Sequence, residues 1–157
     1  MTTPEPRDRT FDDYTVGETF EFGYLDVTAA EIVEFGRKYD PQPFHVDAEA
    51  AKTSIFGGLI ASGWHTGAMA MRLYVDNVLS PEHSLGSPGV DELRFLAPVR
   101  PGARLALRVT VLDLVPSRSK PDRGVVRQRL EVLDAAADPP VLVASMATMG
   151  LFRRRGA

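Results

Sequence analysis

A stretch of almost uncharged sequence between Gly63 and about Leu79 constrains the fold most strongly, because only Arg72 and Asp76 within it carry charge. We predict a long helix over this stretch. A helix that is apolar on most sides is buried rather than laid on a protein surface. The rest of the chain must therefore supply a layer that covers it.

Four strands are predicted after this helix, and they could form that layer. Residues 103–115 alternate apolar and polar side chains, which is the period of a strand with one buried face. Shorter strands are predicted over 92–97 and 125–133. The last strand, over 141–152, is apolar on both faces, as expected for a central position in a sheet.

The N-terminal part supplies one more strand and two further helices. Aromatic residues alternate with polar ones within 17–28, which predicts the first strand. Thr28 and Glu31 form a capping-box pattern at the start of a helix over 29–39, and a short helix is predicted over 48–52. This order of elements indicates an α+β fold, in which a curled, mostly antiparallel sheet wraps around the long apolar helix.

The chain is organised as one domain. Its 157 residues suit a single domain, and no linker divides them. We assign the domain to residues 11–152, between a flexible tail over 1–10 and a basic tail over 153–157. The three arginines of the basic tail are interpreted as a solvated terminus rather than a nucleic-acid-binding patch.

Composition excludes several classes of protein. The absence of cysteine rules out disulfides, thiolate nucleophiles and cysteine-bound metals. The net charge of −3 gives no general electrostatic footprint for nucleic acid. The N-terminus lacks the apolar region of a signal peptide, and no run of about 18 apolar residues predicts a membrane span. We therefore expect a cytoplasmic protein that binds neither nucleic acid nor a membrane.

Two residues with acid–base chemistry lie just after the helix over 29–39. Pro41 and Pro43 disfavour helical geometry in the residues before them, so the helix should end near Asp40. His45 follows five residues later. A fully extended segment of that length would span roughly 17 Å, so the segment must turn back if the two side chains are to hold one water.

This pair, next to a helix N-terminus, has the parts needed to hydrate a polarised double bond. Adding water to an α,β-unsaturated thioester requires a base for the water and a proton for the α-carbon, which Asp40 and His45 could supply. The thioester oxygen gains negative charge and needs fixed hydrogen-bond donors. The backbone N–H of Gly63 could supply one at the start of the apolar helix, with Ser62 as its N-cap.

The segment from Tyr39 to Asp47 resembles the signature of the MaoC-like hydratase/dehydratase family, which includes (R)-specific enoyl-CoA hydratases. The family pattern is usually Asp-x-Asn-Pro-(Leu/Ile)-His-x-Asp, and it is matched here by Asp40, Pro43, His45 and Asp47. The resemblance extends from about residue 11 to residue 152. Its motif is fairly specific.

The resemblance implies a fold, an assembly and a reaction. The fold would be a hot-dog fold, and the assembly a homodimer or higher homo-oligomer with an acyl-CoA tunnel near the subunit interface. The reaction would be hydration of a 2-enoyl-CoA to an (R)-3-hydroxyacyl-CoA, with Asp40 and His45 holding the water. The family's thioester-binding amide corresponds to that of Gly63, and neither a metal nor a redox cofactor is implied.

Three positions depart from the family pattern. Gln42 stands where Asn is usual, Phe44 where a smaller aliphatic residue is usual, and Ser62 where a His usually precedes the glycine. We therefore expect an altered substrate pocket, with Ser62, Phe44 and Trp64 as candidate substrate-binding residues. His65 is interpreted as a structural histidine rather than an acid.

Other interpretations remain open. A hot-dog thioesterase would use a carboxylate to direct water at the thioester carbonyl itself. A non-catalytic acyl-CoA-binding module would keep the scaffold without turnover. Asp40, His45 and Asp47 could instead bind a metal ion, since Asp and His are common ligands, although no second cluster of ligands accompanies them.

Overall fold

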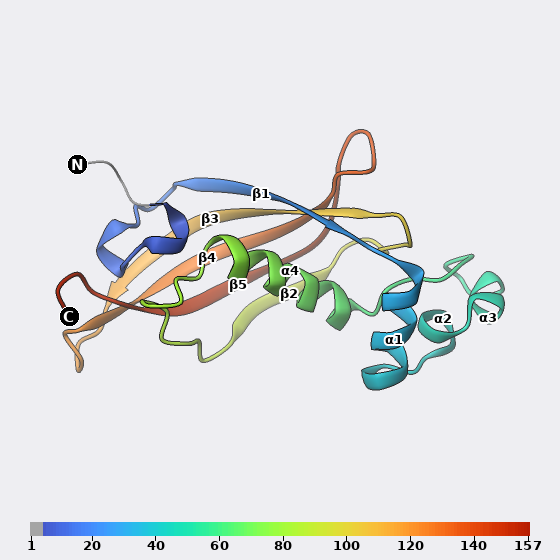
Figure 1. Ribbon diagram of the computed structural model, residues 1–157, viewed down its shortest axis with the longest axis horizontal. Helices are drawn as coiled ribbons and strands as arrows, with labels where there is room; N and C mark the ends of the chain where they lie inside the picture. Colours follow the sequence, from blue (N-terminus) through green and yellow to red (C-terminus); the bar gives the residue numbers. More distant parts are fainter. Residues whose placement is uncertain (1–4) are drawn as a thin grey trace.

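A five-stranded antiparallel sheet forms the centre of the computed structural model, which describes residues 5–157 (Figure 1). Its strands lie in the order β1-β3-β4-β5-β2, so that β1 and β2 are the edges. β5 pairs with β4 on one side and β2 on the other, which confirms the interior position that its apolar sequence predicts. The strand bounds are β1 (Thr19–Asp26), β2 (Val90–Phe95), β3 (Arg104–Pro116), β4 (Arg123–Asp134) and β5 (Val141–Arg153).

Helix α4 (Gly63–Asn77) lies along one face of the sheet, and three shorter helices gather at the end where it begins (Figure 1). These are α1 (Ala29–Tyr39), α2 (Pro43–Val46) and α3 (Ala48–Lys52). The predicted bounds of α1 are confirmed. The single turn of α2 is an addition, because the sequence predicts a loop there.

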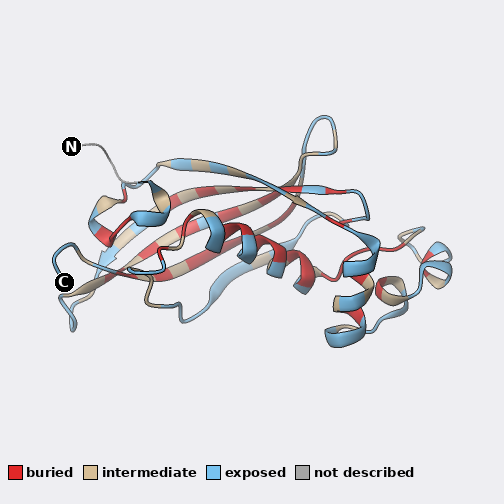
Figure 2. Cartoon of the chain, viewed as in Figure 1, coloured by how far each residue is buried: buried red, intermediate tan, exposed pale blue. Residues whose placement is uncertain are grey.

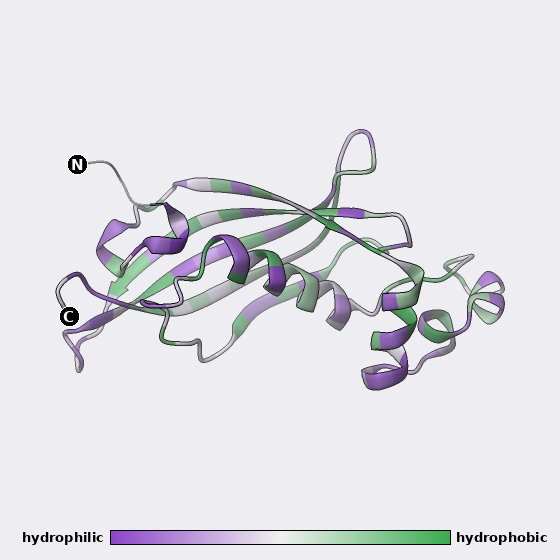
Figure 3. Cartoon of the chain, in the orientation of Figure 1, coloured by the Kyte–Doolittle hydropathy of each residue, from purple (hydrophilic) through white to green (hydrophobic). Residues whose placement is uncertain are grey.

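The hydrophobic core lies between α4 and the sheet (Figure 2). Leu105, Leu107 and Val109 of β3 are fully buried, and a more exposed residue separates each from the next. Figure 3 shows a related alternation of hydropathy along the strands. Ala70 and Leu73 of α4 belong to the same core. The predicted α+β fold with a curled antiparallel sheet is confirmed.

The expected enclosure of α4 by the sheet is not confirmed. One face of α4 is buried, but Trp64, Met71 and Val75 are 65%, 49% and 37% exposed. A single sheet on one side of a helix covers only one of its faces, so these apolar residues lie outside the core. Figure 2 shows both buried and exposed positions along α4. No helix within residues 5–157 is long and apolar enough to cross a membrane.

Two residues near the N-terminal end of the described chain, Arg9 and Thr10, pack closely against the domain. Residues Pro6–Asp8 form a 3₁₀-helix, and Arg9 and Thr10 are buried. The guanidinium of Arg9 donates a hydrogen bond of 2.8 Å to Glu18 and lies over the ring of Phe20. This differs from the flexible tail predicted over 1–10, of which residues 1–4 lie outside the described residues.

The basic C-terminal residues are held by a second 3₁₀-helix, Phe11–Asp13. Arg154 donates to Asp12 at 2.8 Å, and Arg155 pairs with Asp13. Arg153 is the last residue of β5. The arginines interpreted as a solvated terminus are therefore partly engaged in ion pairs.

Candidate active site

Asp40 is held at the C-terminal end of α1. Thr28 begins this helix by accepting a hydrogen bond of 3.2 Å from the backbone N–H of Glu31, as the capping pattern predicts. The N–H of Asp40 donates to the carbonyl of Gly36 at 2.8 Å, and Asp40 itself leaves helical geometry. Pro41 follows and favours an extended backbone before it.

The segment after Asp40 turns back on itself, as the proposed chemistry requires. The N–H of Gln42 donates to the carbonyl of Asp40 at 2.8 Å, and α2 begins at Pro43. The N–H of His45 then donates to the carbonyl of Gln42 at 2.9 Å. The result is a distance of 3.3 Å between Nε2 of His45 and Oδ2 of Asp40.

Gly36 permits this close packing of α2 against α1. A Cβ at position 36 would lie 2.9 Å from Cγ1 of Val46 and 3.0 Å from the carbonyl oxygen of His45. Such contacts are too short for the two helices to keep their separation. The missing side chain therefore sets the distance at which His45 meets the end of α1.

His45 is buried and its ring is oriented by the backbone. Only 4% of the residue is exposed, and Nδ1 lies 2.8 Å from the carbonyl oxygen of Ile60. Because a carbonyl oxygen only accepts hydrogen bonds, Nδ1 carries a hydrogen. In the neutral ring the lone pair therefore lies on Nε2, the nitrogen that faces Asp40.

Two further side chains hold the carboxylate of Asp40. The hydroxyl of Ser62 donates to Oδ2 at 2.7 Å, and the amide of Gln42 donates to Oδ1 at 2.8 Å. The bond from Ser62, followed by that from Gln42, holds the pKa of Asp40 below its usual value, and the nearby His45 acts in the same direction. The carboxylate is therefore ionised at neutral pH.

Ser62 also begins α4, which confirms its assignment as an N-cap. Its oxygen accepts a hydrogen bond of 3.3 Å from the N–H of Trp64, and only 1% of the residue is exposed. The first N–H groups of a helix have no partner within it and carry partial positive charge. A single serine thus joins the Asp40 carboxylate to the positive end of α4.

A cavity of about 320 Å³ lies against His45 and Gly63. Its walls are mainly apolar, and Phe44, Phe56 and Phe95 supply three aromatic rings. Phe95 packs directly on Gly63, since a Cβ at position 63 would lie 2.4 Å from its ring. The cavity could hold an apolar group beside the imidazole and the start of α4.

Two aromatic residues near the start of α4 lie outside this cavity. Trp64 is 65% exposed and meets the ring of Phe95 edge-on at 6.1 Å between centroids. His65 is buried and stacks on Phe35 at 4.8 Å. The structure therefore places Phe44 in the cavity wall and Ser62 on the carboxylate of Asp40, but it does not bring Trp64 into the cavity.

The metal-ligand interpretation gains no support. The carboxylate of Asp47 caps α3 by accepting hydrogen bonds from the N–H groups of Glu49 and Ala50. Among the residues that the structure describes, no group of three His, Cys, Asp or Glu side chains could hold a metal ion. Within the described part of the chain, Asp40 and His45 thus form a pair without a third metal-ligating side chain beside them.

Three contributors to the site are not identifiable from the motif alone. Gln42 departs from the family pattern, yet its side-chain amide donates a hydrogen bond to Asp40. The sequence does hold a signal for this contact, because the amide lies two residues after the acid in a turn. Gly36 inside a predicted helix is a recognised sign of close packing. The carbonyl of Ile60 gives no sequence signal, because every residue has one.

Several known proteins are similar to this chain in sequence and in fold. The family described as "MaoC like domain" matches residues 12–134. A MaoC-like dehydratase from Rhodospirillum rubrum has a crystal structure with a TM-score of 0.83 and 40% identity, covering 93% of this chain and 98% of that one. (R)-hydratase PhaJ1 from Pseudomonas aeruginosa gives a TM-score of 0.72 and 25% identity, covering 90% and 83%.

A third relative extends the comparison to a named dehydratase. The 3-hydroxybutyryl-CoA dehydratase of Methylorubrum extorquens is 29% identical over 119 residues, which are 74% of this chain and 73% of the relative. The family match spans most of the domain, including α4 and the segment that carries Asp40 and His45. The chain therefore belongs to the MaoC-like dehydratase domain family and has its hot-dog fold.

Proposed function

We propose that this protein is a hydro-lyase that interconverts a 2-enoyl-CoA and the corresponding (R)-3-hydroxyacyl-CoA. The observation that carries the proposal is the 3.3 Å approach of His45 Nε2 to Asp40 Oδ2 beside the first turn of α4. Two acceptors at this separation can each receive a hydrogen from one water. The relatives named as an (R)-hydratase and a 3-hydroxybutyryl-CoA dehydratase support the same reaction class.

The water is held with its oxygen free to react. It donates one hydrogen to Nε2 of His45 and the other to Asp40, and its oxygen attacks the β-carbon of the enoyl group. Nε2 takes the proton as the carbon–oxygen bond forms, while Nδ1 keeps its hydrogen bond to Ile60. The ionised Asp40 stabilises the resulting imidazolium, and its lowered pKa suits this role better than the role of base.

The second proton transfer completes the addition. The imidazolium returns its proton from Nε2 to the α-carbon, which restores neutral His45. In dehydration the neutral ring of His45 removes the α-proton, and the imidazolium then protonates the leaving hydroxyl. His45 therefore transfers the proton in both directions, with Asp40 beside it.

The negative charge on the thioester oxygen needs stabilisation between these steps. The N–H of Gly63 and the positive end of α4 supply it from fixed positions. The apolar cavity beside Gly63 takes the acyl chain, with Phe44 and Phe95 against it. Ser62 positions Asp40 and does not bind substrate in this scheme.

A spectroscopic assay tests the proposal. Hydration of crotonyl-CoA removes its conjugation, so the ultraviolet absorbance of the enoyl thioester falls. Asp40→Asn and His45→Gln should each lower the rate at least about 100-fold, whereas Glu49→Gln, at an exposed carboxylate on α3, should not change it. A folded Asp40→Asn variant with an unchanged rate would refute the assignment.

The same reaction mixture separates the alternatives. A thioesterase would release free CoA thiol, which a thiol reagent detects, without forming the hydroxyacyl product. A binding module would retain acyl-CoA without turnover, and Asp40→Asn would alter only its affinity.

We further propose that the functional unit is a homodimer formed along β2. Within residues 5–157, no strand pairs with the outer side of this edge strand, and such edges invite pairing with another chain. Val90 and Phe95 in β2 are 47% and 50% exposed, and Trp64 and Met71 are exposed on α4. Sedimentation velocity should show a dimer, and Val90→Lys should shift it toward monomer; a monomer at all concentrations would contradict the proposal.

A further inference from the structure

The loop after α3, residues 53–58, carries one of the aromatic rings that line the cavity beside His45. This ring belongs to Phe56, and it meets the ring of Phe44 edge-on at 5.2 Å between centroids. Phe44 in turn meets the imidazole of His45 edge-on at 4.6 Å. The two phenyl rings, which we call the Phe44–Phe56 wall, therefore stand next to the group that transfers the proton in the proposed reaction.

One side chain anchors this loop to a distant part of the chain. Nη2 of Arg100 donates a hydrogen bond of 2.6 Å to the carbonyl oxygen of Phe56, across 44 positions. Within residues 5–157, the other hydrogen bonds of the loop reach no further than the last turn of α3. Phe56 is also not part of the hydrophobic core between α4 and the sheet. The position of Phe56 thus depends on Arg100 and on its contact with Phe44.

The fold holds Arg100 where it can make this bond. The carbonyl of the preceding Val99 accepts a hydrogen bond of 2.8 Å from the N–H of Ala61, and Val99 is 2% exposed. The guanidinium lies close to the loop, since a Cβ at position 58 would be 3.5 Å from Nη1. Arg100 forms no ion pair with any described residue, so no carboxylate competes with the carbonyl of Phe56. A charged donor makes a stronger hydrogen bond than a neutral one.

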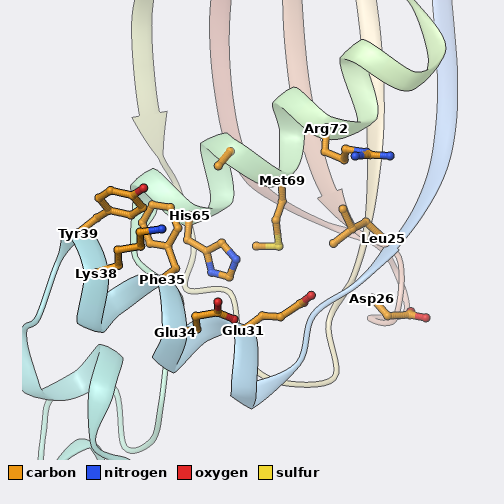
Figure 4. Close-up of a pocket in the computed structure, with 11 residues that line it drawn as sticks. Leu25, Asp26, Glu31, Glu34, Phe35, Lys38, Tyr39, His65, Met69 and Arg72 are labelled. Carbon is orange, nitrogen blue, oxygen red and sulfur yellow. The ribbon is translucent and has the colours of Figure 1, made fainter.

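The neighbouring cavity offers no alternative space for an alkyl branch. It lies between α1, α4 and the end of β1, and its volume is about 420 Å³ (Figure 4). It shares no lining residue with the cavity beside His45. Charged side chains, among them Glu31, Lys38 and Arg72, lie around it (Figure 4), and burying them against an alkyl group would be costly. The width available to an acyl group beside His45 is therefore set by the walls of its own cavity.

We propose that Arg100 is a positioning residue, which fixes the Phe44–Phe56 wall and thereby makes the cavity select straight acyl chains over branched ones. This inference rests on the proposed function, in which the acyl group occupies the cavity and His45 acts on its α- and β-carbons. The wall beside the imidazole then meets the next carbon, C4. A methyl branch at C4 widens the acyl group at that point, and a wall that is held in place cannot move aside for it.

Two isomeric thioesters test the wall through binding alone. Hexanoyl-CoA and 4-methylpentanoyl-CoA have the same composition and no double bond to hydrate, and they differ only in the branch. Isothermal titration calorimetry with the full chain should give a dissociation constant at least about tenfold lower for hexanoyl-CoA, the effect of one badly placed carbon in an apolar pocket. Equal binding of the two isomers, or no measurable binding of either, overturns the inference.

Variants of Arg100 and Phe56 locate the cause of the selectivity. Arg100→Met keeps an apolar stem but removes the donor, and it should reduce the ratio of the two dissociation constants to about 3 or less. Arg118→Met, at an exposed arginine between β3 and β4, should leave the ratio unchanged. In a Phe56→Ala background Arg100→Met should have no further effect, because the ring that it positions is gone.

A different role for Arg100 would give a different pattern. If its charge only attracted the phosphates of CoA, Arg100→Met would weaken the binding of both isomers by the same factor. An unchanged ratio in Arg100→Met, or a further change of the ratio in the Phe56→Ala background, therefore overturns the positioning role.

Turnover is measured separately, so that this inference and the proposed reaction can fail independently. Hex-2-enoyl-CoA and 4-methylpent-2-enoyl-CoA are the matching enoyl isomers, and their ratio of kcat/KM should follow the ratio of dissociation constants in each variant. Selective binding without hydration of either enoyl isomer would contradict the reaction and support the wall. Hydration of both enoyl isomers with equal kcat/KM would support the reaction and overturn the inference.

Discussion

Ser62 Oγ donates a hydrogen bond of 2.7 Å to Asp40 Oδ2 across 22 positions of the chain. The same hydroxyl oxygen accepts from the N–H of Trp64 at the start of α4, and His45 Nε2 approaches the same carboxylate oxygen. The orientation of the candidate catalytic pair thus depends on the residue that starts the long helix. In this chain that residue is a serine, where the family pattern usually has a histidine.

Replacing Ser62 should therefore affect catalysis more than folding. Ser62→Ala removes the bond that fixes Asp40, and we expect kcat for hydration of a short enoyl-CoA to fall at least about tenfold. The loss of the N-cap should cost about 1 kcal/mol of unfolding free energy. Steady-state kinetics and urea unfolding of the same preparation measure both effects.

Two controls separate positioning from stability. Ser62→Thr keeps the hydroxyl and should retain most of the activity. Ser80→Ala removes another buried serine that accepts backbone hydrogen bonds, from Glu82 and His83. It should lose stability without losing turnover. Equal losses of activity in the two alanine variants would contradict a positioning role for Ser62.

The lowered pKa of Asp40 predicts how the stability cost of Ser62→Ala depends on pH. A carboxylate whose folded pKa lies below its unfolded value adds stability above about pH 4, and this stability is lost as pH falls through the folded pKa. Ser62→Ala raises the folded pKa toward the unfolded one. The cost of the substitution should therefore be larger at about pH 7 than at about pH 3. Urea unfolding at both values measures it, and an equal cost at both would show that Ser62 acts only as a helix cap.

Local sequence patterns were sufficient to predict the bounds of the helices that frame the site. Thr28 and Pro41 mark the two ends of α1, so its bounds could be predicted from residues within one turn of each end. The N-cap at Ser62 follows from the same local rule. The return of His45 toward Asp40 could be required from the chemistry, since an extended segment would keep the two side chains apart.

Contacts between distant segments could not be predicted in this way. His45 bonds the carbonyl of Ile60, 15 positions away, and that contact exists only once the chain between them has folded. The second bond of Ser62, to Asp40, has the same character. The exposed outer face of α4 was missed for a related reason: a count of apolar residues does not tell which face the sheet covers.

Gly63 should be intolerant of a side chain because of its contact with Phe95. The added Cβ of Gly63→Ala would lie 2.4 Å from that ring, so the ring must move. We expect a loss of about 1–3 kcal/mol of unfolding free energy and a lower kcat/KM, because the ring forms part of the cavity wall. In a Phe95→Ala background the same substitution should cost little. A double-mutant cycle measures this coupling, and a cost that persists without the ring would contradict it.

Gly36 offers a second test of how packing sets the distance between Asp40 and His45. Alanine usually stabilises a helix relative to glycine by about 0.5–1 kcal/mol, and Gly67→Ala in α4 should do so, because nothing lies within 4 Å of its added Cβ. Gly36→Ala should instead destabilise the protein by about 1–3 kcal/mol, since its Cβ would press on Val46 and on the backbone of His45. The displaced α2 would carry His45 away from Asp40, so turnover should fall even where the variant is fully folded. Urea unfolding and enoyl-CoA hydration of the two alanine variants make the comparison, and a Gly36→Ala protein as stable and active as Gly67→Ala would show that the separation of α1 and α2 does not set the geometry of the pair.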